Sequence, residues 1–194
     1  MGRPKAFDED TVLDAATELF WSQGYDATSM ADLEAGMGMG RQSIYNAFGD
    51  KRALFLRALE RYIRNNGENV DATLRAPGRG LDAIRRHFEA LVDFAAPQGP
   101  RRGCLVANSI LEVGESDEAI AGRCQANQEL VLDGFRHALR TAIADGDLSE
   151  AVDVDAMARM LLAQTYGMSV LSKAGASRRE LRDSVEELLA RLGA

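Results

Sequence analysis

The sequence contains few cysteines and few histidines, and this scarcity excludes the disulfide-rich and metal-binding classes of protein. Of its 194 residues, two are cysteine and two are histidine. Cys104 and Cys124 form no CxxC pair, and neither His87 nor His137 stands at a metal-ligand spacing from them. The sequence therefore predicts no zinc site, and we expect no metal and no cofactor. A structural disulfide is also not expected in a reducing compartment.

Long apolar runs and targeting signals are also missing. No segment approaches 18 consecutive apolar residues, so no membrane span is predicted. The first residues, MGRPKAF, lack the charged region and apolar core of a secretory signal. No Ser-His-Asp set, metal-ligand spacing or phosphate-binding loop is found. We therefore expect a cytoplasmic protein that has no membrane partner and is not an enzyme.

Helical periodicity is what the sequence does contain, and it continues almost without interruption. Apolar residues recur at the i, i+3, i+4 and i+7 positions that line one face of a helix. The pattern predicts an all-α fold with about nine helices. The residues around Cys104 also fit a short strand when taken alone, but such a strand would have no neighbours. The expected helices span approximately residues 8–23, 29–37, 41–47, 51–75, 81–95, 103–113, 117–144, 154–172 and 178–192.

Two of the expected helices are short and are separated by a glycine-rich turn. Thr28 and Ser29 are good N-cap residues for the first, because their hydroxyl groups accept an unpaired backbone N–H. Gly38 ends this helix, and the second begins after Gly40. Asp50 then caps a longer third helix. Short helix, turn and short helix is the pattern of a helix-turn-helix motif, whose second helix enters the major groove of DNA.

The second short helix has a polar face of the kind that reads DNA. Ile44 and Phe48 alone have the spacing to be buried. Arginine, glutamine and asparagine pair bidentately with base edges, and serine reaches a base or a phosphate. A solvated face on an ordinary helical hairpin has the same composition, so both interpretations stay open at this point. The polar face consists of Arg41, Gln42, Ser43, Tyr45 and Asn46.

Basic residues are concentrated near the same helix, although the chain carries a net charge of −7. Residues 41–64 contain six basic and two acidic residues. Among them, Lys51 is placed to bind a phosphate together with the N-terminus of the third helix. Arg3 and Lys5 form a short basic arm that could follow the phosphate backbone or a minor groove; a frayed terminus is an equal alternative. Because such an asymmetry also arises by chance, it supports a DNA partner without establishing one.

The run Tyr45-x-x-Phe48-x-x-Lys51 is the most specific element of a longer pattern. Over residues 8–62 this pattern resembles the N-terminal signature of the tetracycline-repressor (TetR) family of transcription regulators. The other two-thirds of the chain carry no motif of this kind. The further matching positions are Thr28-Ser29, Leu33, Gly38, Arg41, Ile44 and Leu54-Phe55.

Three positions depart from the family pattern. Gly40 stands where a serine cap is usual, and Glu34 and Gly36 stand where alanine is usual. Gly36 is expected to weaken the end of the first short helix by up to about 1 kcal/mol relative to alanine. Together with the polar face, the resemblance implies a set of DNA-binding residues. The set consists of Arg3, Lys5, Thr28, Ser29, Arg41, Gln42, Ser43, Tyr45, Asn46 and Lys51.

The resemblance also implies how function is divided along the chain. Residues 1–50 are expected to form the helix-turn-helix DNA-binding domain and residues 51–75 a connecting helix. Residues 76–194 are expected to form a helical domain for effector binding and dimerisation. Such a protein would be a homodimeric, ligand-responsive repressor on a palindromic operator in double-stranded DNA, and a small-molecule effector would release it.

The last two expected helices have more apolar surface than a monomer can cover. A large exposed apolar patch usually marks an interface, and two helices from each of two copies form a four-helix bundle. The alternative is that both helices close the core of their own chain. The predicted dimer interface consists of Ala158, Leu162, Thr165, Ser169, Leu181, Val185, Leu188 and Leu189.

Several residues of the second domain are candidates for an effector cavity. Methionine side chains are flexible and polarizable, and they suit adaptable apolar pockets. Ionisable residues are scarce on the expected inner faces, which favours an apolar or aromatic effector. The alternative for each candidate is an ordinary core position. The candidates are Phe88, Phe94, Cys104, Met157, Met160, Tyr166 and Met168.

Cys104 supports a second hypothesis about function. It follows Arg101, Arg102 and Gly103 at the start of an expected helix. Nearby cations and a helix N-terminus favour the reactive thiolate, so the protein could be a regulator that senses oxidants or electrophiles. A buried cysteine that acts as a small apolar residue is the competing interpretation. A helical ligand carrier or enzyme with an incidental helix-turn-helix is a third hypothesis.

Overall fold

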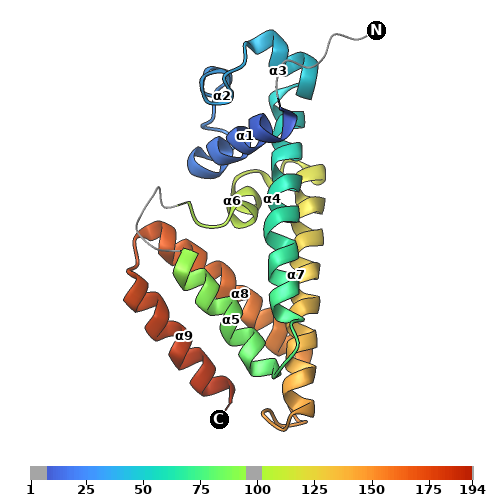
Figure 1. Cartoon of the computed structure of the whole chain (residues 1–194), viewed down its shortest axis with the longest axis vertical. Coiled ribbons are helices and arrows are strands. Elements are labelled where there is room, and N and C mark those ends of the chain that lie inside the picture. The colour runs from blue at the N-terminus through green and yellow to red at the C-terminus, as the bar shows by residue number, and fades with distance from the viewer. Residues whose placement is uncertain (1–7, 95–101, 194) are drawn as a thin grey trace. The chain divides into compact units, whose positions relative to one another are not determined.

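Nine α-helices make up the described part of this computed structural model, which covers residues 8–94 and 102–193 (Figure 1). No strand occurs within these ranges, so the all-α prediction is confirmed. None of the described helices has the length and apolarity that crossing a membrane requires. The helices are α1 (Glu9–Gln23), α2 (Met30–Met37), α3 (Arg41–Phe48), α4 (Lys51–Leu74), α5 (Gly80–Phe94), α6 (Leu105–Val113), α7 (Glu118–Ala144), α8 (Val154–Ala174) and α9 (Arg178–Leu192).

Side-chain caps explain why most helix starts follow from the sequence. The Ser29 hydroxyl accepts the backbone N–H of Asp32, and the Asp32 carboxylate accepts that of Ser29 at 2.8 Å, which completes a capping box. Oδ1 of Asp50 accepts the N–H of Ala53 at 2.7 Å at the start of α4. The segment that also fitted a strand begins at Leu105 and forms α6. The expectation of a helix there is therefore confirmed.

The chain folds into two compact units. Unit 1 consists of Met1–Asn65 and Leu105–Cys124, and unit 2 of Asn66–Cys104 and Gln125–Ala194. α4 and α7 therefore contribute residues to both units, and α6 lies wholly in unit 1. The functional boundaries at residues 50 and 75 stay predictions. The grouping of α6 with the N-terminal helices is a feature that the sequence did not indicate.

The core of unit 1 is built from side chains of α1 to α4. The rings of Phe20 and Phe55 meet edge to face, with 4.9 Å between their centroids, and both are buried together with Ile44. A Cβ atom on Gly36 would lie 2.5 Å from Cδ1 of Leu19. The glycine thus lets α2 approach α1 closely, and the departure from alanine at this position has a packing reason.

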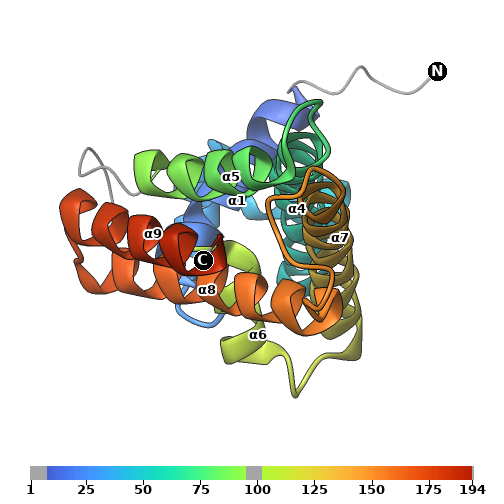
Figure 2. The same cartoon turned by 90° about the horizontal axis from the view of Figure 1, so that it is seen from below.

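In unit 2, α5, α8 and α9 lie side by side and share a core with part of α7 (Figure 2). The rings of Phe88 and Phe135 stack with 6.1 Å between their centroids. α8 and α9 add Leu161 and Leu181, which are 0 % and 1 % exposed. The apolar stripes predicted for α5 and α9 therefore pack within one unit.

Gly80 marks a close approach of α5 to the backbone of α7. A Cβ atom there would lie 2.1 Å from the carbonyl oxygen of Ala138 and 2.4 Å from the amide nitrogen of Ala142. We predict that Gly80→Ala lowers the free energy of unfolding by about 3 kcal/mol, because these helix backbone atoms cannot move aside. Urea unfolding followed by circular dichroism measures the change.

The matched control is Gly122→Ala on α7, where no heavy atom lies within 4 Å of the added Cβ. Its higher helix propensity should raise the free energy of unfolding by up to about 1 kcal/mol. Equal effects of the two substitutions would contradict the close approach.

Candidate nucleic-acid interface

α3 presents one polar face to solvent and buries the opposite face. Ile44 and Phe48 are 0 % and 5 % exposed. Residues four apart lie on the same side of a helix, so both side chains belong to the buried face. The orientation predicted for this helix is therefore confirmed. Arg3 and Lys5, which were also predicted to contact DNA, lie outside the described residues. The exposed side chains of α3 are Arg41, Gln42, Ser43, Tyr45 and Asn46.

The exposed side chains of α3 are ordered in two pairs, each of which joins residues i and i+4. Nε2 of Gln42 donates to Oδ1 of Asn46 at 3.0 Å. The guanidinium carbon of Arg41 lies 5.8 Å from the centroid of the Tyr45 ring, and a hydrogen bond to Tyr45 raises the pKa of Arg41. Side chains that are already paired lose less rotamer freedom on binding. The face is thus partly organised for contact before any DNA is bound.

The turn between α2 and α3 has a defined conformation. Gly38 has a φ of 62°, in the left-handed region that favours glycine, and its N–H donates to the carbonyl of Glu34. Met39 follows it and is buried, with 8 % of its surface exposed. Gly40 is the N-cap of α3 and offers no side-chain hydrogen bond. The glycine-rich turn is therefore anchored by a buried methionine, which was not identified from the sequence.

Thr28 does not have the exposed position that a DNA-binding residue needs. Its side chain is fully buried, and its hydroxyl donates to the carbonyl of Gly24 at 2.6 Å. This prediction is corrected: Thr28 holds the turn before α2 and offers no side-chain surface to DNA. Ser29 is exposed, but its hydroxyl donates to Asp32 at 2.6 Å in the capping box. The same bond lowers the pKa of Asp32.

Lys51 is half-buried and already has partners in unit 1. Its Nζ donates to the carbonyl of Asp26 at 3.3 Å and lies 4.6 Å from the centroid of the Tyr25 ring. Burial, together with the carboxylates of Asp50 and Asp26, raises the pKa of Tyr25. A phosphate bound by Lys51 would share its ammonium group with these partners. The role of Lys51 in DNA binding stays a prediction.

Three basic residues of α4 form ion pairs within unit 1. Arg52 pairs with Asp117, and this hydrogen bond lowers the pKa of Asp117 to about 2. Arg57 pairs with Glu9, and Arg61 pairs with two aspartates of α1. The charge count of residues 41–64 therefore includes three arginines that are already engaged within the unit. They join α4 to other parts of unit 1.

Two family models match the chain. The model described as bacterial regulatory proteins, tetR family, matches residues 12–58. The model of the tetracyclin repressor-like C-terminal domain matches residues 80–188. The uncharacterized HTH-type transcriptional regulator YezE of Bacillus subtilis is 34 % identical over 187 residues, which is 96 % of each chain. The HTH-type transcriptional repressor ComR of Escherichia coli is 30 % identical and aligns over 93 % of this chain and 86 % of its own.

Solved structures lead to the same family. A cysteine variant of the TetR family transcriptional regulator CifR, complexed with 26-base-pair operator DNA, is 32 % identical. The match covers 97 % of this chain and 98 % of that chain, with a TM-score of 0.87. The reduced form of Escherichia coli NemR, at 19 % identity, covers 95 % and 96 % with a TM-score of 0.83, which is a likeness of fold alone.

The helical fold of the described residues, with the exposed polar face of the short helix α3, is that of helix-turn-helix regulators. The chain belongs to the tetR family of bacterial regulatory proteins. Its function is the regulation of transcription by DNA binding, and it is not an enzyme.

The residues predicted to bind an effector lie in different environments. Phe88 and Met168 are buried in the core of unit 2, whereas Phe94 and Met160 are 60 % and 49 % exposed. Buried and exposed side chains do not line one common cavity, so the role of these residues in effector binding stays a prediction. The candidates of intermediate burial are Cys104, Met157 and Tyr166.

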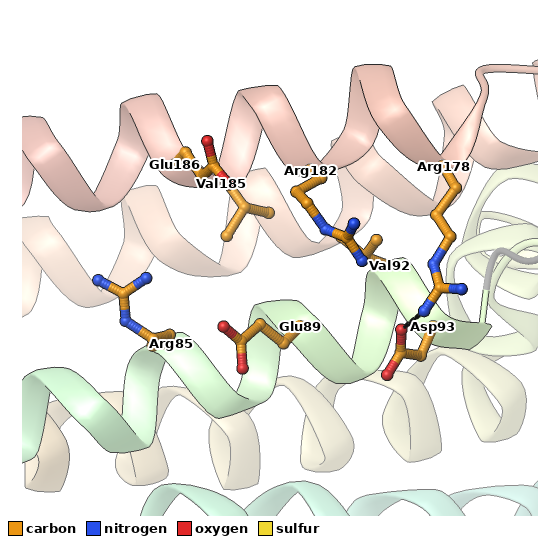
Figure 3. A pocket seen from close by; sticks show the side chains of 8 residues that line it. All are labelled: Arg85, Glu89, Val92, Asp93, Arg178, Arg182, Val185 and Glu186. Atoms are coloured by element: carbon orange, nitrogen blue, oxygen red, sulfur yellow. Dashed lines mark hydrogen bonds and ion pairs between the residues drawn. The ribbon is translucent and has the colours of Figure 1, made fainter.

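A groove of about 400 Å³ lies between α5 and α9 (Figure 3). Arg178 forms an ion pair with Asp93 at one end of it. Charges of both signs in equal number suit a solvated surface better than a site for an apolar effector. None of the predicted effector residues lines this groove. The lining residues are Arg85, Glu89, Val92, Asp93, Arg178, Arg182, Val185 and Glu186.

A buried histidine in unit 2 was given no role from the sequence. His87 is 3 % exposed, and its Nε2 lies 3.0 Å from Oγ1 of Thr165. The Thr165 hydroxyl donates to the carbonyl of Leu161 at 3.0 Å, so the histidine N–H is the donor to Thr165. Burial lowers the pKa of His87 to about 4, and the ring is neutral at pH 7. Apolar periodicity cannot indicate such a residue, because it lies among core positions.

Half of the predicted dimer interface is buried within the chain itself. Ala158 belongs to the core of unit 2, as do Leu181, Val185 and Leu189 of α9. The prediction is corrected for these four residues, because side chains buried in their own unit have no surface for a partner. They close the core of their own chain. The remaining predicted residues, of intermediate burial, are Leu162, Thr165, Ser169 and Leu188.

A different face of α8 is apolar and exposed. Met160, Val170 and Leu171 are 49 %, 52 % and 49 % exposed. A Cβ atom on Gly167 would have no heavy atom within 4 Å. The exposed positions recur at the spacing of a helix face, but on another side from the one predicted. We name this face the α8 stripe; it consists of Ala156, Met160, Ala163, Gly167, Val170, Leu171 and Ala174.

His87 should make the stability of the protein depend on pH. Because the folded pKa is about 4, the unfolded chain binds a proton at this group between about pH 6.5 and pH 4, and the folded chain does not. Stability is therefore lost as the pH falls. We predict a loss of about 2 kcal/mol between pH 7 and pH 5 from this group. Urea unfolding at a series of pH values measures it.

In His87→Leu this contribution should be absent, while the Thr165 hydroxyl keeps its bond to the Leu161 carbonyl. The control is His137→Gln, at an exposed histidine of α7, which should keep the wild-type dependence. Parallel pH profiles for the wild type and His87→Leu would count against the assignment.

Proposed function

We propose that the protein is a cytoplasmic, homodimeric repressor that binds a palindromic DNA operator through α3 and is released by a small-molecule effector. The observation that carries the proposal is the exposed polar face of α3, whose side chains are ordered in two pairs. Two relatives support it: ComR is named a transcriptional repressor, and CifR forms a complex with operator DNA.

In this proposal α3 enters the major groove. The amides of Gln42 and Asn46 suit adenine, and the guanidinium of Arg41 suits guanine. Tyr45 reaches a phosphate or a thymine methyl group from the same face. Lys51, at the start of α4, would contact a phosphate; such a contact would set the register on DNA and carry no sequence information.

A palindromic operator requires a second copy of the protein, and the α8 stripe is the surface that would bind it. Small residues along it, such as Ala163 and Gly167, allow two helices to approach closely. α8 and α9 of two copies would form a four-helix bundle. The exposed side of α9 carries charged residues such as Arg182 and Glu187, so α8 would supply the apolar centre of the interface. On such an operator the α3 helices of the two copies would lie about 34 Å apart, one turn of DNA.

Unit 2 is the proposed effector domain. Its aromatic cluster supports an apolar or aromatic class of effector: the His87 ring meets Phe88 and Phe135 edge to face, with centroids 5.1 Å away in each case. An effector releases the repressor only if its affinity differs between the DNA-bound and the released state. The candidate residues in this unit would supply that difference.

A second candidate function is thiol-based sensing at Cys104, and the position of a neighbouring lysine side chain favours it. Cys104 is a half-buried cysteine that directly precedes α6. A Cβ atom added to Gly103 would lie 3.5 Å from the side chain of Lys173. The lysine side chain therefore passes close to the residue before Cys104. A nearby cation favours the thiolate. The CifR structures contain variants with substituted cysteines.

Alkylation tests the sensing function. If Cys104 senses electrophiles, iodoacetamide should label it in the native protein, whereas Cys124, at 1 % exposed, should react only after unfolding. Lys173→Met should slow labelling of Cys104 severalfold, because the cation is removed. Mass spectrometry of the tryptic peptides measures both sites. A native Cys104 that stays unlabelled would rule out this function.

Arg41→Ala should weaken binding to the DNA upstream of the protein's own gene by about 1–3 kcal/mol, because one base contact is lost. Fluorescence anisotropy at two salt concentrations, with a scrambled duplex for comparison, measures the effect. The matched control is Arg179→Ala, at an arginine of α9 whose side chain is 91 % exposed; its affinity should equal that of the wild type. An equal loss on both duplexes would mean that Arg41 contacts phosphate only.

Gly167→Arg should convert the dimer to a monomer, because a charged side chain would be placed in the α8 stripe. Sedimentation velocity measures the oligomeric state, and circular dichroism confirms that the helices remain. Gly122→Arg, at an exposed helical glycine of α7 with the same free space, should remain a dimer. A dimeric Gly167→Arg would place the interface elsewhere.

A further inference from the structure

The turn between α1 and α2 is built around a carboxylate that α6 supplies. Oε2 of Glu112 accepts the backbone N–H of Tyr25 at 2.8 Å, and Oε1 accepts that of Asp26 at 2.8 Å. Two consecutive N–H groups that point to one anion form a small concave binding site. All three residues belong to unit 1, although Glu112 lies 87 positions after Tyr25 in the chain.

Gly24 leaves room for this carboxylate. Its φ is 94°, a conformation that side chains disfavour. A Cβ atom at this position would lie 2.9 Å from Oε1 of Glu112. A residue with a side chain at position 24 would therefore crowd the carboxylate of Glu112.

The same turn is bonded to the helices on either side of α3. The hydroxyl of Thr28, just before α2, donates to the carbonyl of Gly24 at 2.6 Å. Nζ of Lys51, the first residue of α4, donates to the carbonyl of Asp26 at 3.3 Å. The turn is therefore hydrogen-bonded to both neighbours of α3 in the chain.

A second link joins the residues after α6 to the start of α4. The carboxylate of Asp117 pairs with Arg52, which is next to Lys51 in α4. Oδ1 of Asp117 also accepts the N–H groups of Ala119 and Ile120 at 3.0 and 3.1 Å, which begins α7. The C-terminal end of α6 and the residues that follow are thus tied to the helix-turn-helix at two separate points.

We propose that Glu112 is a positioning residue for DNA binding: its carboxylate fixes the α1–α2 turn and, through that turn, the placement of α2 and α3. This role rests on the proposed function, because the placement has a consequence only if α3 binds DNA. α6 begins at the residue that follows Cys104, where a segment of unit 2 ends. Because Glu112 belongs to α6, a displacement of this helix would withdraw both carboxylate oxygens from the two N–H groups at once.

Glu112→Gln tests the role, because it keeps the shape of the side chain and replaces one acceptor oxygen by an NH₂ group that faces an N–H donor. The loss of a charge-assisted hydrogen bond should speed amide hydrogen exchange at Tyr25 or Asp26 by about tenfold or more. Affinity for the upstream DNA should fall about tenfold, since such a bond contributes that much. The preference for upstream over scrambled DNA should remain, because the base-reading side chains are unchanged.

Two further variants separate positioning from general loss of structure. Glu115→Gln changes an exposed carboxylate between α6 and α7 and should match the wild type in exchange and affinity. Glu112→Asp keeps both carboxylate oxygens on a shorter side chain and should restore slow exchange and DNA affinity in part. Amides in the middle of α5, which belong to unit 2, should exchange at the wild-type rate in all variants.

Each outcome decides the role of Glu112. Unchanged exchange at both amides in Glu112→Gln would overturn the contact, and faster exchange with unchanged DNA affinity would overturn the positioning role. A wild type without preference for its upstream DNA would overturn the proposed function, and the positioning role with it. The exchange measurement needs no DNA, so failure of the contact and failure of DNA binding give different results.

Discussion

The burial of Ile44 and Phe48 is the constraint on which the DNA-binding part of the structure depends. Because these side chains pack into unit 1, the opposite side of α3 must face solvent. On that side, Gln42 and Asn46 are held together by a hydrogen bond. A helix of eight residues has little stability by itself, so core packing, more than helix propensity, determines where these polar groups lie.

The sequence could predict those features of unit 1 that depend on residues close together in the chain. Ser29 and Asp32 are three residues apart, so the start of α2 was predictable from its cap. Contacts between distant residues were not predictable. Arg52 pairs with Asp117, 65 positions away, and a count of the charges near α3 cannot show that this arginine is already paired. Thr28 is a second example. Its hydroxyl group suits an N-cap, but packing against other parts of the unit buries the side chain.

In unit 2 the positions of the helices in the sequence could be predicted, but which side of each helix packs against the core could not. α8 is apolar or weakly polar on most sides, so periodicity alone does not decide which side meets the core. Ala158 is buried, whereas Met160, two residues on, is 49 % exposed. α9 has a single apolar stripe, but the same pattern serves a core or an interface, and Leu181 lies in the core of its own unit. The effector candidates have the same ambiguity.

Hydroxyl-radical footprinting on the DNA upstream of the protein's own gene would show whether α3 reads DNA as one of a symmetric pair. We expect two protected segments on one face of the DNA, related by two-fold symmetry and centred about 10 base pairs apart. Both should disappear with Tyr45→Ala. Protection that ignores sequence and vanishes at moderate salt would show phosphate contacts alone, and α3 would then not read bases.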